Sequence, residues 1–528
     1  MPLIKPMSED LSEFLRDESR NSGHADTISF PACEDDIIAI LRELHDRHTR
    51  VTIQGGRTGL AAAAVPDGGH ILNLSRCNKL LAMREQNGRF YLTVQPGLVL
   101  SQLRKALETR KLDVSAFDTE SLAACHAFAT AGGQFFSPDP TETSAMLGGM
   151  VACNASGARS YFYGATREHI SALRVVLANG ETLTLRRGQL FAAGRRLTLH
   201  TEQGGRYDLT LPTYRMPAAK NASGYYIADN MDAIDLFIGS DGTLGVISEI
   251  ELELLPLPAK IWALTCFFGQ WQQAADFVGQ LRAALPRQSS PIAAIEYFDS
   301  GALEILRKQK QLSGVFGNLL DIDPSYGVAV YLELHCADDE QALRLLRQIG
   351  DIATLAGGDM RHSWVARNAG DRERLIFFRH AVPEAVNMLI DRRKANDPAV
   401  VKLSTDMSVP DGRLRETMQM YVDTLRDSGL EYATWGHIGD NHLHINILPR
   451  DAADCLTGKR LYAEWAARIS AAGGAVSAEH GVGKIKAPFL QTMYGRRHIV
   501  EMARLKQQLD PYFQLGAGNL FAADILNG

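Results

Sequence analysis

The stretch T-W-G-H-I-G-D-N-H-L-H-I-N-I-L, residues 434–448, concentrates three histidines and two asparagines on one short element. From His442 onward polar and apolar residues alternate strictly, which predicts a β-strand with one face in the core and the other facing a site. His442, His444 and Asn446 share the polar face, and His437 reaches it from a glycine-containing turn. The sequence therefore predicts that three imidazoles meet beside one strand.

A second polar cluster, S-A-E-H-G-V-G-K at residues 477–484, follows further along the chain, and its Glu479 can supply an anionic ligand. Two imidazoles and one carboxylate, with open coordination positions, suit a catalytic divalent cation better than a closed structural zinc site. Histidines on a polar strand face are often only hydrogen-bonded, so the first stretch alone leaves both interpretations open. The Glu-His-Gly run favours the metal.

The composition is that of a globular protein. A chain of 528 residues with 45% hydrophobic content is expected to form two or three structural units. The net charge of −6, without a long basic run, argues against nucleic-acid binding. No apolar stretch approaches a membrane span, so we expect a cytoplasmic protein, and peripheral association with a membrane is compatible with the sequence. Seven scattered cysteines without a C-x-x-C pair argue against disulfides and against an iron–sulfur cluster in this chain.

Three glycine-rich runs precede the histidine stretch. The first, residues 54–59, follows a predicted helix and a predicted strand within residues 34–53. A strand that leads into clustered glycines lets backbone N–H groups converge on an anion such as a pyrophosphate. The run does not fit G-x-G-x-x-G, so a Rossmann site is not supported. The other runs lie at residues 147–157, followed by Y-G-A-T-R at 163–167, and at residues 237–247; each alone is equally compatible with a turn.

Together and in this order, the runs resemble the flavin-binding domain of the vanillyl-alcohol oxidase superfamily. The resemblance covers nearly the whole chain and includes D-E-S-R at 17–20, V-Q-P-G at 94–97 and S-P-D-P at 137–140. G-H-I-G-D-N-H-L-H, followed by E-H-G-V-G at 479–483, resembles one branch in particular. That branch contains D-lactate dehydrogenases, D-2-hydroxyglutarate dehydrogenases and the glycolate oxidase flavoprotein subunit.

The resemblance implies an α+β fold with a two-subdomain PCMH-type FAD-binding domain and an α+β substrate-capping domain, whose C-terminal segment returns to the flavin. The expected boundaries are an N-terminal segment at 1–30, the FAD-binding domain at 31–258, the capping domain at 259–435 and a metal-binding catalytic segment at 436–528. The prolines of L-P-L-P, at 255–258, support the boundary near residue 258.

The resemblance also assigns residues to the flavin. The expected FAD-binding residues are Gln54, Gly55, Gly56, Arg57, Thr58, Gly59, Pro138, Gly148, Gly149, Asn154, Gly157, Gly164, Gly242, Thr243, Val246, Ile247 and Asn519. Relatives that attach FAD covalently often use a histidine in the first run. Because Arg57 and Thr58 occupy that region here, we expect a non-covalent flavin.

The implied reaction is the FAD- and metal-dependent oxidation of a D-2-hydroxy acid to the 2-oxo acid. In this interpretation His437, His444 and Glu479 hold one divalent cation, with zinc expected first and manganese second, and His480 is the general base. Electrons would pass to an external acceptor, which could be a quinone, an electron-transfer flavoprotein, a cytochrome or a separate iron–sulfur subunit.

Three residues are candidates for substrate binding. Arg379 is expected to bind the substrate carboxylate, although without the family a solvated helix charge would be the simpler interpretation. Lys402 is the weaker candidate, because its spacing to Asp406 differs from that of relatives. Asn446 shares the polar strand face. A methylene or two in the substrate is worth only about 1–3 kcal/mol of discrimination, so the motifs leave the D-lactate and D-2-hydroxyglutarate classes open.

The chain departs from the family pattern in three places. Asp241 stands where relatives commonly have glutamate. Asn441 and His442 stand where relatives commonly have Gly-Asn, which brings an imidazole near the metal in place of an amide. Residues 112–134 form a longer segment than expected, which is either a lid or, as we expect, a surface helix.

Two other functions stay open at this stage. An alkyl-glycerone-phosphate synthase uses the same fold for a non-redox exchange, but those relatives carry a run of histidines before the final His-Gly, where this chain has Ala478-Glu479-His480. A flavoprotein that only carries electrons is the other alternative. The concentration of metal-ligand residue types disfavours it.

Overall fold

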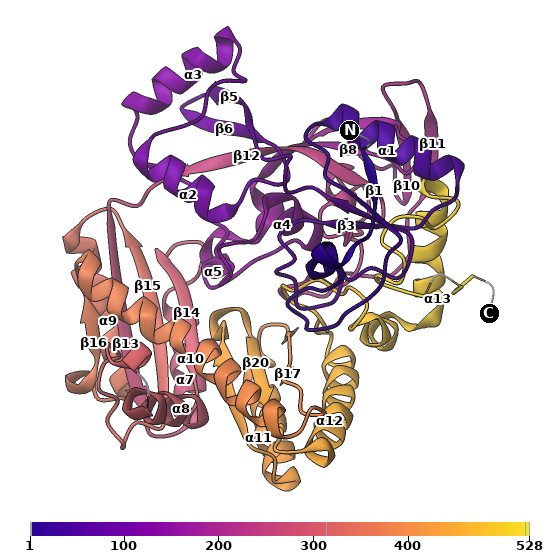
Figure 1. The fold of residues 1–528 in the computed structure, drawn as a ribbon. Coiled ribbons are helices and arrows are strands. Elements are labelled where there is room, and N and C mark those ends of the chain that lie inside the picture. Colours follow the sequence, from indigo (N-terminus) through magenta and orange to yellow (C-terminus); the bar gives the residue numbers. More distant parts are fainter. Residues whose placement is uncertain (1–2, 313, 523, 527–528) are drawn as a thin grey trace.

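The computed structural model describes residues 3–312, 314–522 and 524–526, which fold as a mixed α/β structure (Figure 1). The indigo-to-magenta first half of the chain lies with the yellow C-terminal helix, and the pink and orange segments form the rest. The α+β class predicted from the sequence is confirmed. No helix in the described part of the chain combines the length and hydropathy that crossing a bilayer requires.

The chain begins with a small sheet and its connecting helix: β1 (Ile4–Pro6), β2 (Thr27–Ser29), α1 (Glu34–Asp46), β3 (Val51–Gln54) and β4 (His70–Asn73). The strand order is β1-β2-β4-β3, with β2, β4 and β3 parallel and β1 antiparallel at the edge. Ile37, Ile40, Leu41 and Leu44 form the buried face of α1 at helical spacing. The predicted helix and strand before the first glycine-rich run are confirmed.

An antiparallel sheet follows, with the strands β5 (Leu80–Gln86), β6 (Arg89–Val94), β7 (Gln134–Phe135), β8 (Ile170–Val176), β9 (Thr182–Arg186) and β12 (Val246–Pro256). Its order is β5-β6-β12-β8-β9, and β7 pairs with the end of β12. A separate hairpin is formed by β10 (Arg196–His200) and β11 (Arg206–Thr210). The helices of this half are α2 (Leu100–Thr109), α3 (Thr119–Thr130), α4 (Leu147–Cys153), α5 (Ser160–Tyr163) and α6 (Ile234–Phe237).

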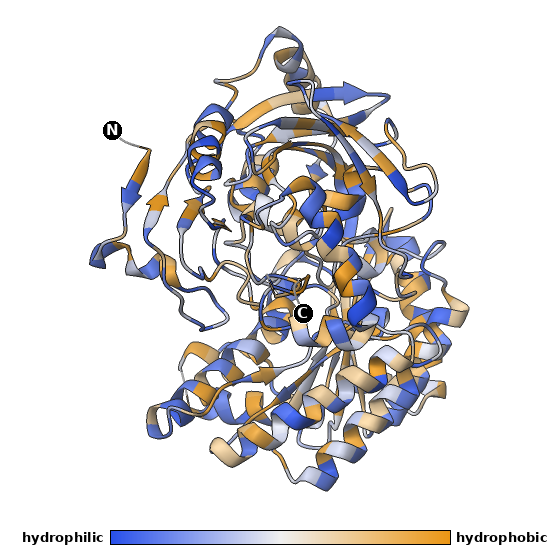
Figure 2. Cartoon of the chain, turned by 90° about the vertical axis from the view of Figure 1, so that its right-hand side faces the viewer, coloured by the Kyte–Doolittle hydropathy of each residue, from blue (hydrophilic) through white to orange (hydrophobic). Residues whose placement is uncertain are grey.

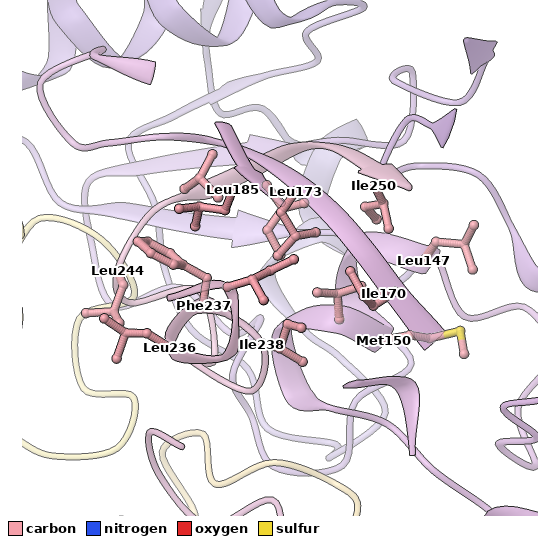
Figure 3. Close-up of a cluster of buried hydrophobic side chains, with 14 of the residues drawn as sticks. Leu147, Met150, Ile170, Leu173, Leu185, Leu236, Phe237, Ile238, Leu244 and Ile250 are labelled. Carbon is pink, nitrogen blue, oxygen red and sulfur yellow. The ribbon is translucent and has the colours of Figure 1, made fainter. Parts of the chain in front are cut away.

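Helix α4, which carries the second glycine-rich run, is anchored in the core of this half (Figure 3). Leu147 and Met150 of α4 belong to the same buried cluster as Ile170 of β8 and Ile250 of β12. The longer segment at residues 112–134 contains α3, which packs against β5. This segment is therefore a surface helix, as expected.

The other half is built on an eight-stranded sheet with the strands β13 (Lys260–Phe268), β14 (Ile292–Phe298), β15 (Val328–Cys336), β16 (Trp364–Ala366), β17 (Leu403–Ser404), β18 (Met407–Ser408), β19 (Tyr432–Gly436) and β20 (His442–Ile447). The order is β16-β13-β15-β14-β19-β20-β17, and β18 also pairs with β20. β19 and β20 pair antiparallel inside this sheet. The boundary proposed at residues 435–436 thus falls within a hairpin that joins the capping strands to the histidine strand.

Helices cover both faces of this sheet: α7 (Trp271–Ala284), α8 (Ser300–Leu312), α9 (Asp339–Leu355), α10 (Ala369–Asn396), α11 (Leu414–Ser428) and α12 (Ala452–Ala471). The buried residues of α7, α9, α11 and α12 join one hydrophobic cluster, and those of α8 and α10 join another. Figure 2 shows hydrophilic and hydrophobic residues interleaved along the helices, as expected where one helix face packs and the other meets water.

The last helix, α13 (Ala487–Leu509), returns to the first half and packs beside β11 (Figure 1). Its Leu490, Met502 and Leu505 belong to the same core as Leu147 of α4. The buried ammonium of Lys506 lies 2.7 Å from Oδ2 of Asp510 and donates to the carbonyl of Thr243, in the third glycine-rich run. The expected return of the C-terminal segment is confirmed.

We expect Lys506→Met to destabilise the protein strongly. The substitution leaves the buried carboxylate of Asp510 without its cation, and breaking a buried pair on one side costs about 3–5 kcal/mol of unfolding free energy. Thermal unfolding followed by fluorescence measures the effect. Lys105→Met, the same change on the exposed face of α2, is the control and should stay within about 0.5 kcal/mol. Equal stability of the two variants would show that the buried pair contributes nothing.

Candidate active site

A cleft in the first half is lined by parts of all three glycine-rich runs. Nine of the predicted flavin residues line it: Gly55, Gly56, Arg57, Thr58, Gly59, Gly148, Gly149, Gly242 and Ile247. A Cβ built on Gly59 or Gly149 would meet no protein atom within 4 Å, so a side chain there would project into open space. Glu479 and His480 also line the cleft. The glycine-rich lining and the polar cluster therefore share one cleft.

The other predicted flavin residues lie outside the cleft lining. Gln54 donates to the carbonyls of Phe14 and Ala64, and Asn519 donates to those of Ala63 and Asp241, so both hold the lining segments in place. Two more, Asn154 and Gly164, line a neighbouring cavity. The remaining predicted flavin residues, Pro138, Gly157, Thr243 and Val246, line neither the cleft nor this neighbouring cavity.

The three histidines of the opening stretch meet, as predicted. The ring centroids of His437 and His442 are 5.2 Å apart, those of His437 and His444 are 5.5 Å apart, and those of His442 and His444 are 4.5 Å apart. Gly436 makes this approach possible. Its φ is +131°, and a Cβ there would lie 2.9 Å from Cδ2 of His444.

Glu479 joins the histidines from the segment after α12. The Nε2 atoms of His437 and His444 each lie 3.2 Å from its Oε1. The Nδ1 atom of each of these two histidines contacts an oxygen atom outside the cluster. His437 Nδ1 is 2.7 Å from Oε1 of Glu296, and His444 Nδ1 is 3.0 Å from the carbonyl oxygen of Thr405. The structure thus brings together the predicted ligand set, and each of these two imidazoles has the outer oxygen partner that metal-ligating histidines usually have.

Asp406 explains how two adjacent side chains, Glu479 and His480, both reach the site. Its carboxylate accepts the main-chain N–H of Glu479 at 3.2 Å and that of His480 at 3.0 Å. Lys486 and the hydroxyl of Ser477 bind the same carboxylate. The backbone there is irregular, since a regular strand would turn successive side chains to opposite faces.

The electrostatics of the cluster are strongly perturbed. Burial raises the pKa of Glu479, but His437 and Lys220 outweigh it and hold that pKa well below its usual range. Burial lowers the pKa of His437, but the carboxylates of Glu296 and Glu479 outweigh it and raise the pKa to about 9. Burial lowers the pKa of His480 to about 4. Clusters of this kind are typical of functional sites.

His480 lies beside the ligand set without belonging to its centre. Its ring stacks on that of His444, with centroids 5.4 Å apart. Nδ1 lies 3.5 Å from Oδ2 of Asp406, and Nε2 lies 3.6 Å from Oε1 of Glu479. Nδ1 therefore faces the structural carboxylate, and Nε2 faces the site.

The predicted substrate residues lie in three different environments. Arg379 is buried beside Asp139, with Nη2 3.5 Å from Oδ2. Burial lowers the pKa of Arg379, but Asp139 and Glu296 outweigh it and raise the pKa, so the guanidinium keeps its charge. Lys402 contacts Asn387 at 3.1 Å and lies over the Trp435 ring. Burial lowers the pKa of Lys402 to about 8.

Asn446 is fully buried on the histidine face of β20. Its Nδ2 donates to the carbonyl of His444, and its Oδ1 has no hydrogen-bond partner among the described residues. A buried amide oxygen without a partner is costly, so it is available to a donor that enters the site.

The sequence patterns did not identify several residues of the site. The ammonium of Lys220 lies 2.7 Å from Oε2 of Glu479, and its K-N-A-S-G context carries no metal-site pattern. Glu296 interrupts the apolar strand I-A-A-I-E-Y-F, residues 292–298, and a carboxylate in a buried strand is a signal that could have found it. Asp406 lies within a polar stretch of the sequence, but its contacts with Glu479, His480 and Lys486 join segments that are distant in the sequence.

Comparison with known proteins places the chain in a family. Residues 257–520 match the model described as FAD linked oxidases, C-terminal domain, and residues 25–126 and 118–186 match the one described as FAD binding domain. The chain belongs to the FAD-linked oxidase family. It is a flavin-dependent oxidoreductase that binds FAD, and the resemblance found in its motifs is confirmed.

Curated relatives align over most of this FAD-linked oxidase. A D-2-hydroxyglutarate dehydrogenase of Xanthomonas citri pv. viticola is 29% identical over 98% of this chain and 94% of that protein. The glycolate oxidase subunit GlcD of Bacillus subtilis is 25% identical over 94% of this chain and 89% of its own length. A D-lactate dehydrogenase of Anaerostipes hadrus is 24% identical over 96% of this chain and 92% of its own.

Solved structures share the fold. The 4-ethylphenol oxidase of Gulosibacter chungangensis has a TM-score of 0.65 and 17% identity over 99% of this chain and 95% of its own. An alkyldihydroxyacetonephosphate synthase has a TM-score of 0.62 and 15% identity over 97% of this chain and 82% of its own. At these identities the likeness shows the fold alone, so the second match does not favour the synthase reaction.

Proposed function

We propose that this FAD-linked oxidase oxidises a D-2-hydroxy acid of the D-lactate or D-2-hydroxyglutarate class to the 2-oxo acid and uses a divalent cation to do so. The observation that carries the proposal is the buried set of imidazoles and one carboxylate, Glu479, which also lines the flavin cleft. The names of the relatives, two of them D-2-hydroxy-acid dehydrogenases, support the substrate class.

The donor set fits a cation. The candidate ligand atoms, including those of His437, His444 and Glu479, lie within 4.8 Å of one another, and all three side chains are buried. Imidazole and carboxylate together suit zinc first and manganese second. When bound, the cation supplies the charge that lowers the pKa of the substrate hydroxyl, and FAD supplies the acceptor for the hydride.

Protein side chains bind the substrate and accept its hydroxyl proton. Arg379 binds the substrate carboxylate through its fixed guanidinium plane. Asn446 offers its unpartnered Oδ1 to a donor on the substrate, and Lys402 is the weaker candidate because its contacts are with Asn387 and Trp435. His480 accepts the hydroxyl proton at Nε2, because Asp406 lies on the Nδ1 side of the ring.

An anaerobic flavin-bleaching screen tests the proposed function. D-lactate, D-2-hydroxyglutarate, glycolate, D-malate and larger 2-hydroxy acids are mixed with the holoenzyme, and both enantiomers of each chiral acid are compared. We expect a D-acid to bleach the flavin and its L-enantiomer to leave it oxidised. If dithionite reduces the flavin but no 2-hydroxy acid does, the proposal is wrong and a non-redox or electron-carrying role takes its place.

The reduced flavin must pass its electrons to an acceptor outside this chain. The described residues hold no cysteine cluster that could carry an iron–sulfur centre, since each of the seven cysteines is free and scattered. We propose that reduced flavin passes its electrons to a quinone, an electron-transfer flavoprotein, a cytochrome or a separate iron–sulfur subunit.

We expect the FAD to be held without a covalent bond. The first run places Arg57 and Thr58 at the cleft, and neither is a residue type that attaches flavin in relatives. Cys153 also lines the cleft, but burial raises the pKa of its thiol to about 12, which keeps it protonated and unreactive. Acid precipitation should release all yellow colour into the supernatant. Colour retained in the washed pellet would contradict this prediction.

A further inference from the structure

His442 is the imidazole that stands where relatives commonly have an amide, and its environment is unusual. The side chain is completely buried at the start of β20. Its Nε2 lies 3.0 Å from Oδ1 of Asp406, but neither ring nitrogen has a hydrogen-bond partner among the described residues. An unpartnered polar atom in a buried position is costly, so we expect Nδ1 of His442 to bind a ligand.

The three imidazoles of the site share one arrangement. Each has one ring nitrogen beside an oxygen outside the cluster: Glu296 for His437, Thr405 for His444 and Asp406 for His442. The second nitrogen of each faces Glu479, at 3.2 Å for His437 and His444 and at 4.0 Å for His442. An outer oxygen that fixes the ring and leaves the inner nitrogen free is the usual arrangement of a metal-ligating histidine.

The ligand atoms are close enough for one ion. One atom from each of His437, His442, His444 and Glu479 lies within 4.8 Å of the others. Bonds of about 2.0–2.2 Å from a central cation require ligand atoms no more than about 4.4 Å apart, so a small side-chain adjustment completes the site.

A second candidate set contains Asp406, His444, Glu479 and His480. Asp406 already accepts two main-chain N–H groups and also binds Ser477 and Lys486. A carboxylate committed to four donors is poorly placed to bind a cation as well. The set with three imidazoles is therefore favoured, and it leaves His480 outside the coordination sphere.

We propose that His442 is a third imidazole ligand, so that the cation is bound by three nitrogens and one carboxylate. This inference rests on the proposed function only in requiring a cation at the site. A nitrogen-rich set selects zinc, cobalt, nickel or copper over manganese. It would also leave fewer open positions for the substrate than two imidazoles and a carboxylate would.

X-ray absorption spectroscopy of the zinc-loaded, FAD-containing enzyme tests the inference by counting imidazoles. The wild type should fit three imidazoles, and His442→Asn, which restores the residue type common in relatives, should fit two. Zinc affinity measured by competition with a chelator should fall at least as much as the 10–100-fold that loss of an outer partner of a ligand costs. The zinc-to-manganese preference should fall with it. His126→Asn, which removes an exposed histidine of α3, reports adventitious metal and should change neither quantity.

The possible outcomes separate the two proposals. Two imidazoles in the wild type, or unchanged zinc affinity in His442→Asn, would overturn the role of His442 and leave the proposed function intact. A wild-type enzyme that binds no cation yet is bleached by a D-2-hydroxy acid would overturn the metal site as a whole. Because the wild-type count alone decides the question, the test holds even if the variant does not fold.

Discussion

His437→Asn is expected to lose the cation and, with it, flavin reduction by substrate. The imidazole lies 3.2 Å from Glu479 and is fixed from behind by Glu296, so asparagine cannot reproduce its ligand atom. Metal analysis of the purified variant should find far less cation than in the wild type, while the FAD spectrum stays nearly the same. Anaerobic stopped-flow should show no bleaching on the wild-type time scale.

Chelation of the wild type provides the matched control for that variant. Prolonged dialysis against a chelator should abolish flavin reduction by substrate and leave the flavin bound, and readdition of zinc should restore the rate. The prediction is wrong if a verified metal-free enzyme is fully active, or if His437→Asn retains stoichiometric cation.

His480→Asn is expected to separate the base from the metal. Asp406 holds this part of the backbone through main-chain N–H groups, so the substitution leaves Glu479 in place. We therefore expect wild-type FAD and cation content, retained substrate binding, and flavin reduction slower by about 10²-fold or more, the lower end of what a general base contributes.

The two variants must differ for this division of roles to hold. Loss of the cation from His480→Asn would make His480 a ligand. Near-normal flavin reduction in that variant would make it a bystander. In either case the proton acceptor would have to be sought elsewhere in the site.

Much of the histidine site could be predicted from the sequence, because strict alternation in a short strand fixes which side chains share a face. That pattern placed His442, His444 and Asn446 on one face of β20. The glycine-rich runs likewise predicted a cleft, although only part of the assigned residues line it.

The rest could not be predicted because it depends on contacts between distant segments. Lys220 reaches Glu479 across 259 positions of the sequence, and Glu296 reaches His437 across 141. No local periodicity encodes such pairs. Strands β19 and β20 lie together in the eight-stranded sheet, although a domain boundary was expected at residue 435. Strand pairing depends on tertiary contacts, so the local sequence did not predict this arrangement.

The return of α13 has a consequence for how the protein is made. The core that contains Leu147 and Leu173 also contains Leu490 and Met502, and Leu515 lies beside Val51 of β3. During synthesis the early strands therefore leave the ribosome long before the helix that completes their core. The eight-stranded sheet, encoded in between, can close first. We therefore expect stable capture of FAD to be a late event, which follows the synthesis of α13.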